Sequence, residues 1–564
     1  MKYSTRPRFV SGAEAAVVVT TLALITGCGA ADDLPTVDVG DAPPAQTDEL
    51  RTSHAPKLKW VPCGEDTPGF ECAVAAVPLD YDAPRGPKTG VALAKFPASD
   101  PDNKIGTLFI NPGGPGGSGV GFAFGFAEVL ESWLGGRFDV IGFDPRGVGA
   151  SEPLRCFDTL AEIDPYLDPG FPYLPEQRRP YFETQRALGK ICLGRGQRIA
   201  SHMSTADVVR DLDWLRQAVG DAKLSYLGFS YGSYIGNTYA NMFPDKVRAL
   251  AIDGVLDPRL WSSGWQILSD RVASDETLAE FFRLCDEAAS DCPFGGPEGS
   301  AAQYRALADA LLEAPLVDED GFVFGYDELI GITAGALYQP EVWVDAAALF
   351  ALLAEAVAGE VSAVETARAS YESLRERLSG TPGPSEPEAP AEEYPNDFDA
   401  FLGNHCADAE YPRTFAEFRA IGALAEKNSL FGPYWWWFNA GCSAWPVSKD
   451  RYLGPWTART SAPVLVIGNY FDPSTHYDGA VASSKLLKNS RLLSYAGWGH
   501  TAFARSACVT DYTLDYLLEG VLPPKGTVCP ENPNPFLPVP ELRVARALAP
   551  IGLPPSWVIG RPTR

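Results

Sequence analysis

The residues Gly228-Phe-Ser-Tyr-Gly232 form a G-x-S-x-G pattern, which places a serine between two glycines. A largely apolar segment, Leu224–Phe229, precedes Ser230, and a stretch with helical spacing, Tyr231–Met242, follows it. A serine on a sharp strand-to-helix turn exposes its hydroxyl, and the helix N-terminus faces the charge that develops on a reacting carbonyl. The pattern therefore predicts that Ser230 is a catalytic nucleophile. An ordinary glycine-rich turn is the alternative.

A serine hydroxyl needs an imidazole to accept its proton and a carboxylate to orient that imidazole. Two later segments supply these groups, each after a predicted strand. Asp472 follows the apolar segment 462–469, and His500 follows the segment 491–495. Serine, aspartate and histidine come in this order along the chain of α/β-hydrolases. We therefore expect Ser230, Asp472 and His500 to form a catalytic triad.

Two positions of the triad have competing candidates. His476 lies in the same loop as Asp472 and competes with His500 for the role of base. Asp253 and Asp257 follow an earlier predicted strand and compete with Asp472 for the role of acid. The identity of the serine is therefore better defined by the sequence than the identity of its partners.

A second glycine-rich segment follows the predicted strand 107–111. It reads Pro112-Gly-Gly-Pro-Gly-Gly-Ser-Gly119 and offers backbone N–H groups with almost no side chains. In α/β-hydrolases such a loop donates one hydrogen bond to the oxyanion, and the residue after the nucleophile donates another. We expect Gly114 and Tyr231 to be these donors. A glycine-rich turn or a phosphate loop is the alternative, but no Gly-Lys-Ser/Thr sequence follows.

The elements that must position these residues follow an α/β pattern with one long interruption. Predicted strands and helices alternate over residues 58–259 and 453–564, whereas residues 260–452 are mostly helical. We therefore predict an α/β-hydrolase fold, in which a helical cap is inserted into a mostly parallel central sheet. A stretch rich in Pro and Glu, 379–396, is expected to be a mobile loop of the cap.

The N-terminus has the pattern of a processing signal. A basic start precedes the apolar run 15–25, which is too short to remain in a membrane. The run ends in Leu24-Ile-Thr-Gly-Cys28, which resembles a bacterial lipobox. We expect a lipoprotein signal peptide over residues 1–27, a lipid on Cys28 and a flexible tether over 28–57. A plain secretory signal is the alternative; both predict export, to the extracellular face of the membrane or into the medium.

The chain contains 11 cysteines, and without Cys28 the others form couples of neighbours along the sequence. In an exported protein such couples predict structural disulfides, and pairing between neighbours is the simplest scheme. The chain has no C-x-x-C and only five histidines, so we expect neither a metal site nor a cofactor. The expected pairs are Cys63 with Cys72, Cys156 with Cys192, Cys285 with Cys292, Cys406 with Cys442, and Cys508 with Cys529.

Composition limits the partners of this chain. Its 564 residues include 46 basic and 72 acidic side chains, for a net charge of −26. Such an acidic balance disfavours nucleic acids and anionic membrane surfaces as partners. We therefore expect membrane contact only through the lipid anchor. The same charge is compatible with a substrate that carries an amine.

A set of short motifs spans the chain from about Trp60 to Cys529 in a fixed order. They are Val77-Pro-Leu-Asp-Tyr81, Asn111-Pro-Gly-Gly-Pro-Gly-Gly-Ser-Gly119, Phe143-Asp-Pro-Arg-Gly-Val-Gly149, Gly228-Phe-Ser-Tyr-Gly232, Asp253-Gly-Val, and the tail Cys508 to Cys529 after Gly499-His500-Thr. In these motifs the chain resembles the secreted tripeptidyl aminopeptidases of actinobacteria, which are α/β-hydrolase serine peptidases related to prolyl aminopeptidases. The resemblance implies this fold, a Ser-His-Asp triad and peptidase activity.

The acid loop departs from the pattern of these relatives. Their loop usually reads Asp-Pro-Val-Thr-Pro, and here it reads Asp472-Pro-Ser-Thr-His-Tyr477. The acid is retained, while the shape of the loop differs. The fold alone does not set the substrate, because it also hosts esterases and lipases.

Three functions are compatible with these residues. The first, which we expect, is an aminopeptidase that releases short peptides such as tripeptides from peptides or proteins with a free N-terminus. The second is a cell-surface esterase or lipase with the same triad. The third is a catalytically silent binding protein, which is disfavoured because every catalytic position carries a competent residue.

An aminopeptidase must bind the substrate ammonium at a fixed distance from Ser230, and a desolvated ammonium needs carboxylates. In the related prolyl aminopeptidases such carboxylates come from the cap. The predicted cap contains Asn404-His-Cys-Ala-Asp-Ala-Glu410, which a Cys406–Cys442 disulfide would hold. We therefore expect Asp408, and after it Glu410, to bind the amine.

Overall fold

The computed structural model describes residues 55–538, except 168–169, 197 and 380–395. The predicted signal peptide, Cys28, nearly all of the predicted tether and most of the predicted loop 379–396 therefore lie outside the described residues. All described residues belong to one unit of the chain, residues 39–564. Within the part that is described, no helix has both the length and the apolar character needed to cross a bilayer.

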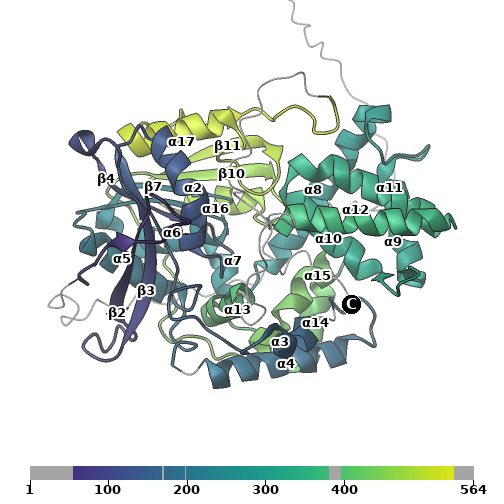
Figure 1. Ribbon diagram of the computed structural model, residues 1–564, viewed down its shortest axis with the longest axis horizontal. Helices are drawn as coiled ribbons and strands as arrows, with labels where there is room; N and C mark the ends of the chain where they lie inside the picture. The colour runs from purple at the N-terminus through teal and green to yellow at the C-terminus, as the bar shows by residue number, and fades with distance from the viewer. Residues whose placement is uncertain (1–54, 168–169, 197, 380–395, 539–564) are drawn as a thin grey trace, which may run out of the picture. The chain divides into compact units, whose positions relative to one another are not determined.

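A ten-stranded sheet organises the first and last parts of the chain (Figure 1). Its strand order is β1-β2-β3-β5-β4-β6-β7-β10-β11-β12. The pairs among β1, β2, β3 and β5 are antiparallel, and all later pairs are parallel. The predicted mostly parallel α/β sheet is thus confirmed. The strands are β1 (Val61–Pro62), β2 (Glu71–Pro78), β3 (Lys88–Phe96), β4 (Gly106–Asn111), β5 (Phe138–Phe143), β6 (Leu224–Phe229), β7 (Val247–Asp253), β10 (Val464–Phe471), β11 (Ser490–Trp498) and β12 (Val528–Cys529).

Helices cover both faces of this sheet, as a parallel sheet with buried strands requires. Every residue of the central strand β6 is buried. One hydrophobic core forms between one face and the helices α5 (Thr205–Ala218), α6 (Tyr231–Met242) and α16 (Tyr477–Leu486). A second core forms between the other face and the helices α2 (Gly119–Trp133) and α17 (Ala507–Glu519).

The region predicted as the cap is helical and has its own large core. That core includes the aromatic run Trp435, Trp436 and Trp437, whose side chains are at most 5% exposed. The run therefore packs inside the cap. The elements are α7 (Pro258–Ser263), α8 (Ile267–Ala288), α9 (Ser300–Glu313), β8 (Leu316–Val317), β9 (Val323–Phe324), α10 (Tyr326–Tyr338), α11 (Trp343–Val357), α12 (Val361–Ser379), α13 (Asp397–Asp408), α14 (Phe415–Ala425) and α15 (Gly432–Trp437).

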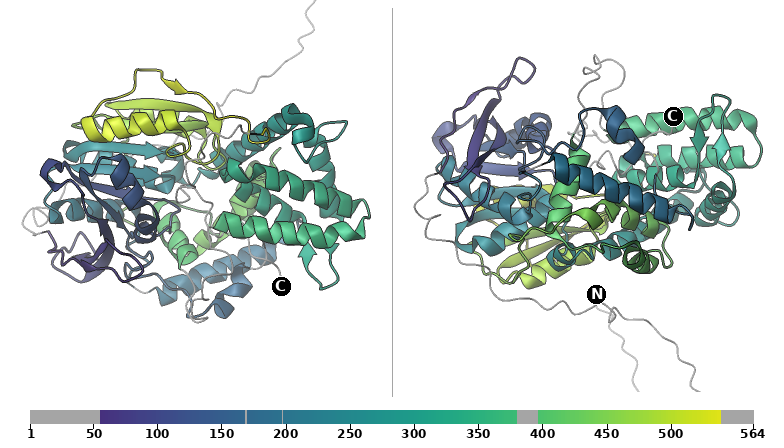
Figure 2. Two further views of the ribbon diagram at one scale, coloured as in Figure 1. Left: turned by 45° about the horizontal axis from the view of Figure 1, so that its top comes forward. Right: turned by 90° about the horizontal axis from the view of Figure 1, so that it is seen from below.

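One excursion from the sheet domain joins the cap. The helices α3 (Leu160–Leu167) and α4 (Arg178–Arg195) precede the nucleophile in the chain, yet α4 lies beside α14 (Figures 1 and 2). Phe182 of α4 contacts Phe418 of α14 with ring centroids 5.3 Å apart. The cap in space therefore includes a segment that the sequence pattern assigned to the first part of the sheet domain.

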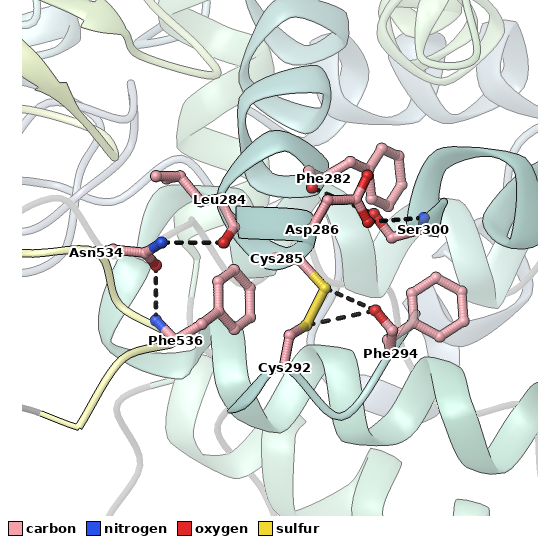
Figure 3. The surroundings of a disulfide bond; sticks show 9 residues. All are labelled: Phe282, Leu284, Cys285, Asp286, Cys292, Phe294, Ser300, Asn534 and Phe536. Carbon is pink, nitrogen blue, oxygen red and sulfur yellow. Dashed lines mark hydrogen bonds between the residues drawn. A yellow bond between two sulfur atoms is a disulfide. The ribbon is translucent and has the colours of Figure 1, made fainter. Parts of the chain in front are cut away.

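All five expected cysteine couples are disulfides in the structure. The bond between Cys285 and Cys292 closes the C-terminal end of α8 (Figure 3). Beside it, the Asn534 side chain donates a hydrogen bond of 2.9 Å to the carbonyl of Leu284. The C-terminal segment thus fastens the far end of the long helix α8, whose other end lies beside the catalytic loops described below.

Candidate active site

Ser230 lies at the turn between β6 and α6 with φ 55° and ψ −123°. A positive φ is strained for a serine and persists only where the surroundings hold it. A side chain could not replace either flanking glycine. A Cβ on Gly228 would lie 2.5 Å from the carbonyl oxygen of Gly232, and a Cβ on Gly232 would lie 2.8 Å from that of Asn111. Ser230 itself remains partly exposed.

His500 and Asp472 form a close pair in the loops after β11 and β10. His500 Nδ1 lies 2.9 Å from Asp472 Oδ1 and 3.1 Å from Oδ2. Burial opposes ionisation of Asp472, but His500 and the N–H groups of Ser474 and Thr475 outweigh burial and hold its pKa below the usual value. An ionised carboxylate at Nδ1 leaves Nε2 as the nitrogen that can take a proton from serine.

Asp253, the last residue of β7, connects the nucleophile turn to the histidine loop. The Ser230 N–H donates to the Asp253 carbonyl at 2.9 Å. The Asp253 carboxylate accepts hydrogen bonds of 2.9 and 2.7 Å from the N–H groups of Ala502 and Phe503. Burial raises the pKa of Asp253 to about 6. Asp253 therefore supports the loop of His500, while Asp472 contacts the imidazole.

Asp257 and His476, which also compete for the roles of acid and base, have different contacts. Asp257 caps the N-terminus of α7 and binds Arg259 at 2.7 Å. His476 Nε2 lies 3.0 Å from Glu276 Oε2 on α8. Burial alone would lower the pKa of His476, but Glu276 outweighs it and raises that pKa. Neither residue contacts the pair of His500 and Asp472 through a hydrogen bond in the described structure.

The glycine-rich loop runs directly against the nucleophile turn. A Cβ on Gly113 would lie 2.4 Å from the carbonyl oxygen of Phe229 and 2.9 Å from the backbone nitrogen of Tyr231. Only glycine allows this approach, and Gly113 also has a positive φ of 96°. The loop that carries Gly114 therefore lies beside Tyr231, the second predicted oxyanion donor.

The cap contacts both loops of the triad. The His500 N–H donates to the carbonyl of Tyr338 at 3.0 Å, and the two rings lie edge to face with centroids 4.8 Å apart. Ser274 of α8 donates to the carbonyl of Pro473 at 2.7 Å and accepts a hydrogen bond of 2.9 Å from Trp435 Nε1. The sequence did not indicate these contacts, because the residues of α8 and α10 carry no motif.

Asp270, in the first turn of α8, is a carboxylate with no cationic partner among the described residues. It is one helical turn before Ser274 and so shares the face of α8 that contacts the acid loop. Its side chain is partly exposed and accepts one hydrogen bond of 2.7 Å, from Gln266. Burial, with the charge of Asp472, raises the pKa of Asp270 well above its usual range. Within the described residues no basic side chain offsets this effect.

Asp408 does not have the environment expected of an amine anchor. It is 2% exposed. Its Oδ1 accepts a hydrogen bond of 2.8 Å from the Thr205 N–H. Its Oδ2 accepts hydrogen bonds from Thr205 Oγ1 at 2.6 Å and Trp261 Nε1 at 3.0 Å. Burial raises the pKa of Asp408 to about 6. Both oxygens are thus engaged inside the protein, which disfavours Asp408 as the group that binds a substrate amine.

Glu410, the second expected anchor, is exposed. It lines an open pocket of about 610 Å³ with Trp265, Tyr411 and Glu417.

The described residues also include two clusters whose side chains lie close enough together to hold a metal ion. The first is Cys156, Cys192 and Asp399, but its two cysteines form a disulfide; the second is Asp80, His202 and Asp450. In the second, Lys449 lies 3.8 Å from Asp80. The triad belongs to neither cluster.

Comparison with known proteins identifies the family. The family model described as the alpha/beta hydrolase fold matches residues 106–506. The chain belongs to the α/β-hydrolase family. The serine protease Hip1 of Mycobacterium tuberculosis is 32% identical over 502 residues, which are 84% of this chain and 91% of that protein. The tripeptidyl aminopeptidase of Streptomyces lividans is 29% identical over 504 residues, 85% of this chain and 87% of that protein.

A third relative has a different name within the same α/β-hydrolase family. Carboxylesterase B of Mycobacterium tuberculosis is 31% identical over 492 residues, 84% of this chain and 90% of that protein. The resemblance to tripeptidyl aminopeptidases is therefore confirmed, and the chain is a serine hydrolase. These relatives thus carry both peptidase and esterase names.

Proposed function

We propose that this protein is an exported aminopeptidase that releases short peptides, such as tripeptides, from free N-termini. Ser230 is the nucleophile, His500 the base and Asp472 the carboxylate that orients it. The observation that carries the peptidase assignment is Asp270. An uncompensated carboxylate beside the acid loop favours a substrate with a cationic group, and an ester substrate has no need of it.

The reaction proceeds through an acyl-enzyme. His500 Nε2 takes the proton of Ser230 while Oγ attacks the substrate carbonyl. The N–H groups of Gly114 and Tyr231 stabilise the oxyanion of the tetrahedral intermediate. His500 then gives the proton to the leaving amine as the C–N bond breaks. In the second half His500 takes a proton from water, which attacks the acyl carbonyl, and gives that proton to Ser230 Oγ as the peptide acid is released.

The substrate ammonium binds at Asp270 in this proposal. The positive charge of the substrate supplies the missing counter-ion and lowers the pKa of Asp270, so that the bound pair is ionised. Since Asp270 is fixed on α8 and α8 is bonded to the acid loop, the distance from the ammonium to Ser230 is fixed as well. Such a fixed distance sets how many residues are released.

A panel of fluorogenic substrates tests the proposal. Free-amine tripeptides should be cleaved with kcat/KM at least about 10²-fold above the same peptides acylated at the N-terminus, because only the free ammonium supplies a counter-ion to the partly exposed carboxylate of Asp270. Asp270→Asn should remove most of this preference and leave the turnover of a simple acyl ester within about threefold. Equal cleavage of free and acylated peptides would reject the aminopeptidase assignment.

The nucleophile has its own test. A fluorophosphonate should label Ser230 and no other serine, and Ser230→Ala should lower turnover by several orders of magnitude in a folded protein. If the enzyme is labelled at Ser230 but cleaves only acyl esters, the alternative function, a cell-surface esterase or lipase, replaces the aminopeptidase. The similarity to carboxylesterase B supports that alternative.

Export and anchoring rest on the N-terminal pattern alone. Intact-mass analysis of the mature protein from its native host should find a lipid on Cys28. The remaining ten cysteines should not react with an alkylating agent before reduction. An unmodified N-terminus after a different cleavage site would indicate a secreted protein without an anchor.

A further inference from the structure

A chain of hydrogen bonds links the cap helix α13 to the residue after the nucleophile. The Tyr231 hydroxyl lies 2.5 Å from Thr205 Oγ1, which lies 2.6 Å from Asp408 Oδ2. All three residues are at most 2% exposed. Because an ionised carboxylate only accepts, the Thr205 hydroxyl donates to Asp408 and in turn accepts the hydrogen bond from Tyr231.

Asp408 also fixes a second neighbour of Tyr231. Trp261 Nε1 donates to Asp408 Oδ2 at 3.0 Å, and the Trp261 ring lies against the Tyr231 ring with centroids 5.5 Å apart. The carboxylate of Asp408 therefore orients both the Thr205 hydroxyl, which accepts from the Tyr231 hydroxyl, and the Trp261 indole, which packs against the Tyr231 ring.

The other end of α13 contacts the glycine-rich loop. A Cβ on Gly116 would lie 2.2 Å from the carbonyl oxygen of Asp397 and 2.9 Å from the backbone nitrogen of Phe401. Asn404, in the middle of the helix, donates to the carbonyl of Met203 at 2.8 Å. One helix thus contacts the loop of Gly114 at its start and is bonded at its end to Thr205, the partner of Tyr231.

We propose that Asp408 is a positioning residue for the oxyanion hole: acting through Thr205, it holds Tyr231 so that its backbone N–H points at the substrate oxygen. The inference rests on the proposed chemistry at Ser230. Ser230 is held at a strained φ of 55°, so the adjoining residue must be fixed from several sides. Oxyanion stabilisation requires donors that are already oriented before the charge develops.

A matched pair of substitutions tests this role. Thr205→Val keeps the shape and the N–H but removes the hydroxyl, whereas Thr205→Ser keeps both hydrogen-bonding groups. Thr205→Val should lower kcat about 10- to 100-fold with KM within about twofold, equally for a tripeptide and an acyl ester. Thr205→Ser should restore most of the loss. The affinity of Thr205→Val for a peptide aldehyde should fall in parallel with its kcat, because the tetrahedral adduct of the aldehyde places an oxyanion in the hole.

A double-mutant cycle tests whether the residues act as one unit. Tyr231→Phe should lower kcat by a similar factor, and the double variant with Thr205→Val should be little worse than either single one. Thr513→Val is the matched control: Thr513 is also buried and donates at 2.7 Å to the carbonyl of Val509, on a helix outside the site. It should lower the melting temperature comparably and leave kcat unchanged.

Two results would overturn the proposal. One is a folded Thr205→Val variant with kcat within about twofold of the parent, which would make the contact purely structural. The other is a loss confined to KM for free-amine peptides, which would return Asp408 to substrate binding. Both are distinct from a failure of the proposed function in the parent enzyme, where absent labelling of Ser230 would reject the nucleophile and equal cleavage of free and acylated peptides would reject the aminopeptidase.

Discussion

The Ser230 N–H donates a hydrogen bond to the carbonyl of Asp253, and the carboxylate of Asp253 holds the loop that carries His500. One residue at the end of β7 therefore sets the spacing between the nucleophile turn and the base. The next residue, Gly254, also lies close to the base, since a Cβ on it would be only 3.3 Å from the His500 ring. The acid of the triad, Asp472, directly follows the next strand of the sheet, β10, which pairs with β7.

Asp472 contacts the imidazole of His500, whereas Asp253 holds the loop of His500, so neutralising each aspartate should have a different effect. Asp472→Asn should lower kcat about 10³- to 10⁴-fold, because the imidazole loses its orienting carboxylate. Asp253→Asn should lower kcat less than about tenfold, because an amide oxygen can still accept from the Ala502 and Phe503 N–H groups. Steady-state kinetics on one tripeptide compares them; a larger loss for Asp253→Asn would exchange their roles.

Asp253 also makes the stability depend on pH. Burial raises its pKa to about 6, above that of an unfolded aspartate. The folded state therefore binds the proton more tightly, and this contribution to stability is present below about pH 4 and is lost as pH rises through about 6. Asp253→Asn should flatten that decline in the free energy of unfolding, measured by urea titration at several pH values.

Of the two histidines near the acid loop, His500 should matter far more for turnover than His476. His500→Ala should abolish turnover almost as completely as Ser230→Ala. His476→Ala removes a partly exposed contact with Glu276 and a long hydrogen bond of 3.4 Å from the Asp478 N–H at the start of α16, and it should change kcat less than about threefold. Both variants can be compared for fluorophosphonate labelling of Ser230. Loss of labelling in the His476 variant alone would contradict the assignment.

Much of the site could be predicted from sequence because its parts are local. Ser230 is defined by glycines two residues away on either side, and Asp472 and His500 each follow an apolar strand. The contacts of Asp408 could not be predicted in this way. Asp408 is close to a cysteine and acidic neighbours in sequence, but only the packing of α13 against α5 and α7 shows that Thr205 and Trp261 engage its carboxylate.

Asp408 was a candidate from the sequence, whereas Asp270 was not. Asp270 belongs to an ordinary amphipathic helix, and nothing in its sequence surroundings sets it apart from the other acidic residues of an acidic chain. Its importance arises only because Ser274, one turn later, is bonded to the acid loop. The segment of α4 that joins the cap was missed for the same reason: long-range packing leaves no local pattern.

The bond between Ser274 and Pro473 predicts that the cap supports catalysis. Ser274→Ala removes that bond and leaves Trp435 Nε1 without its partner, which should cost about 1–3 kcal/mol of stability. A shifted acid loop should also lower kcat several-fold. Thr277→Val on the same helix is the control, because Thr277 is buried and its hydroxyl donates, among the described residues, to the carbonyl of Ala273 alone. Equal kcat values for the two variants would mean that the cap acts independently of the acid loop.

Asp270 should give the reaction a pH dependence that only free-amine substrates show. Its pKa is raised well above the usual range by burial, so the free enzyme holds this carboxyl protonated at low pH. Binding an ammonium requires the ionised form, and kcat/KM for a free tripeptide should therefore increase as pH rises toward that pKa. The acyl ester does not use Asp270, and its profile should lack this limb. Asp270→Asn should remove the difference by lowering the tripeptide profile to a shape parallel to that of the ester. If the two substrates give parallel profiles in the parent enzyme, the substrate ammonium does not bind at Asp270.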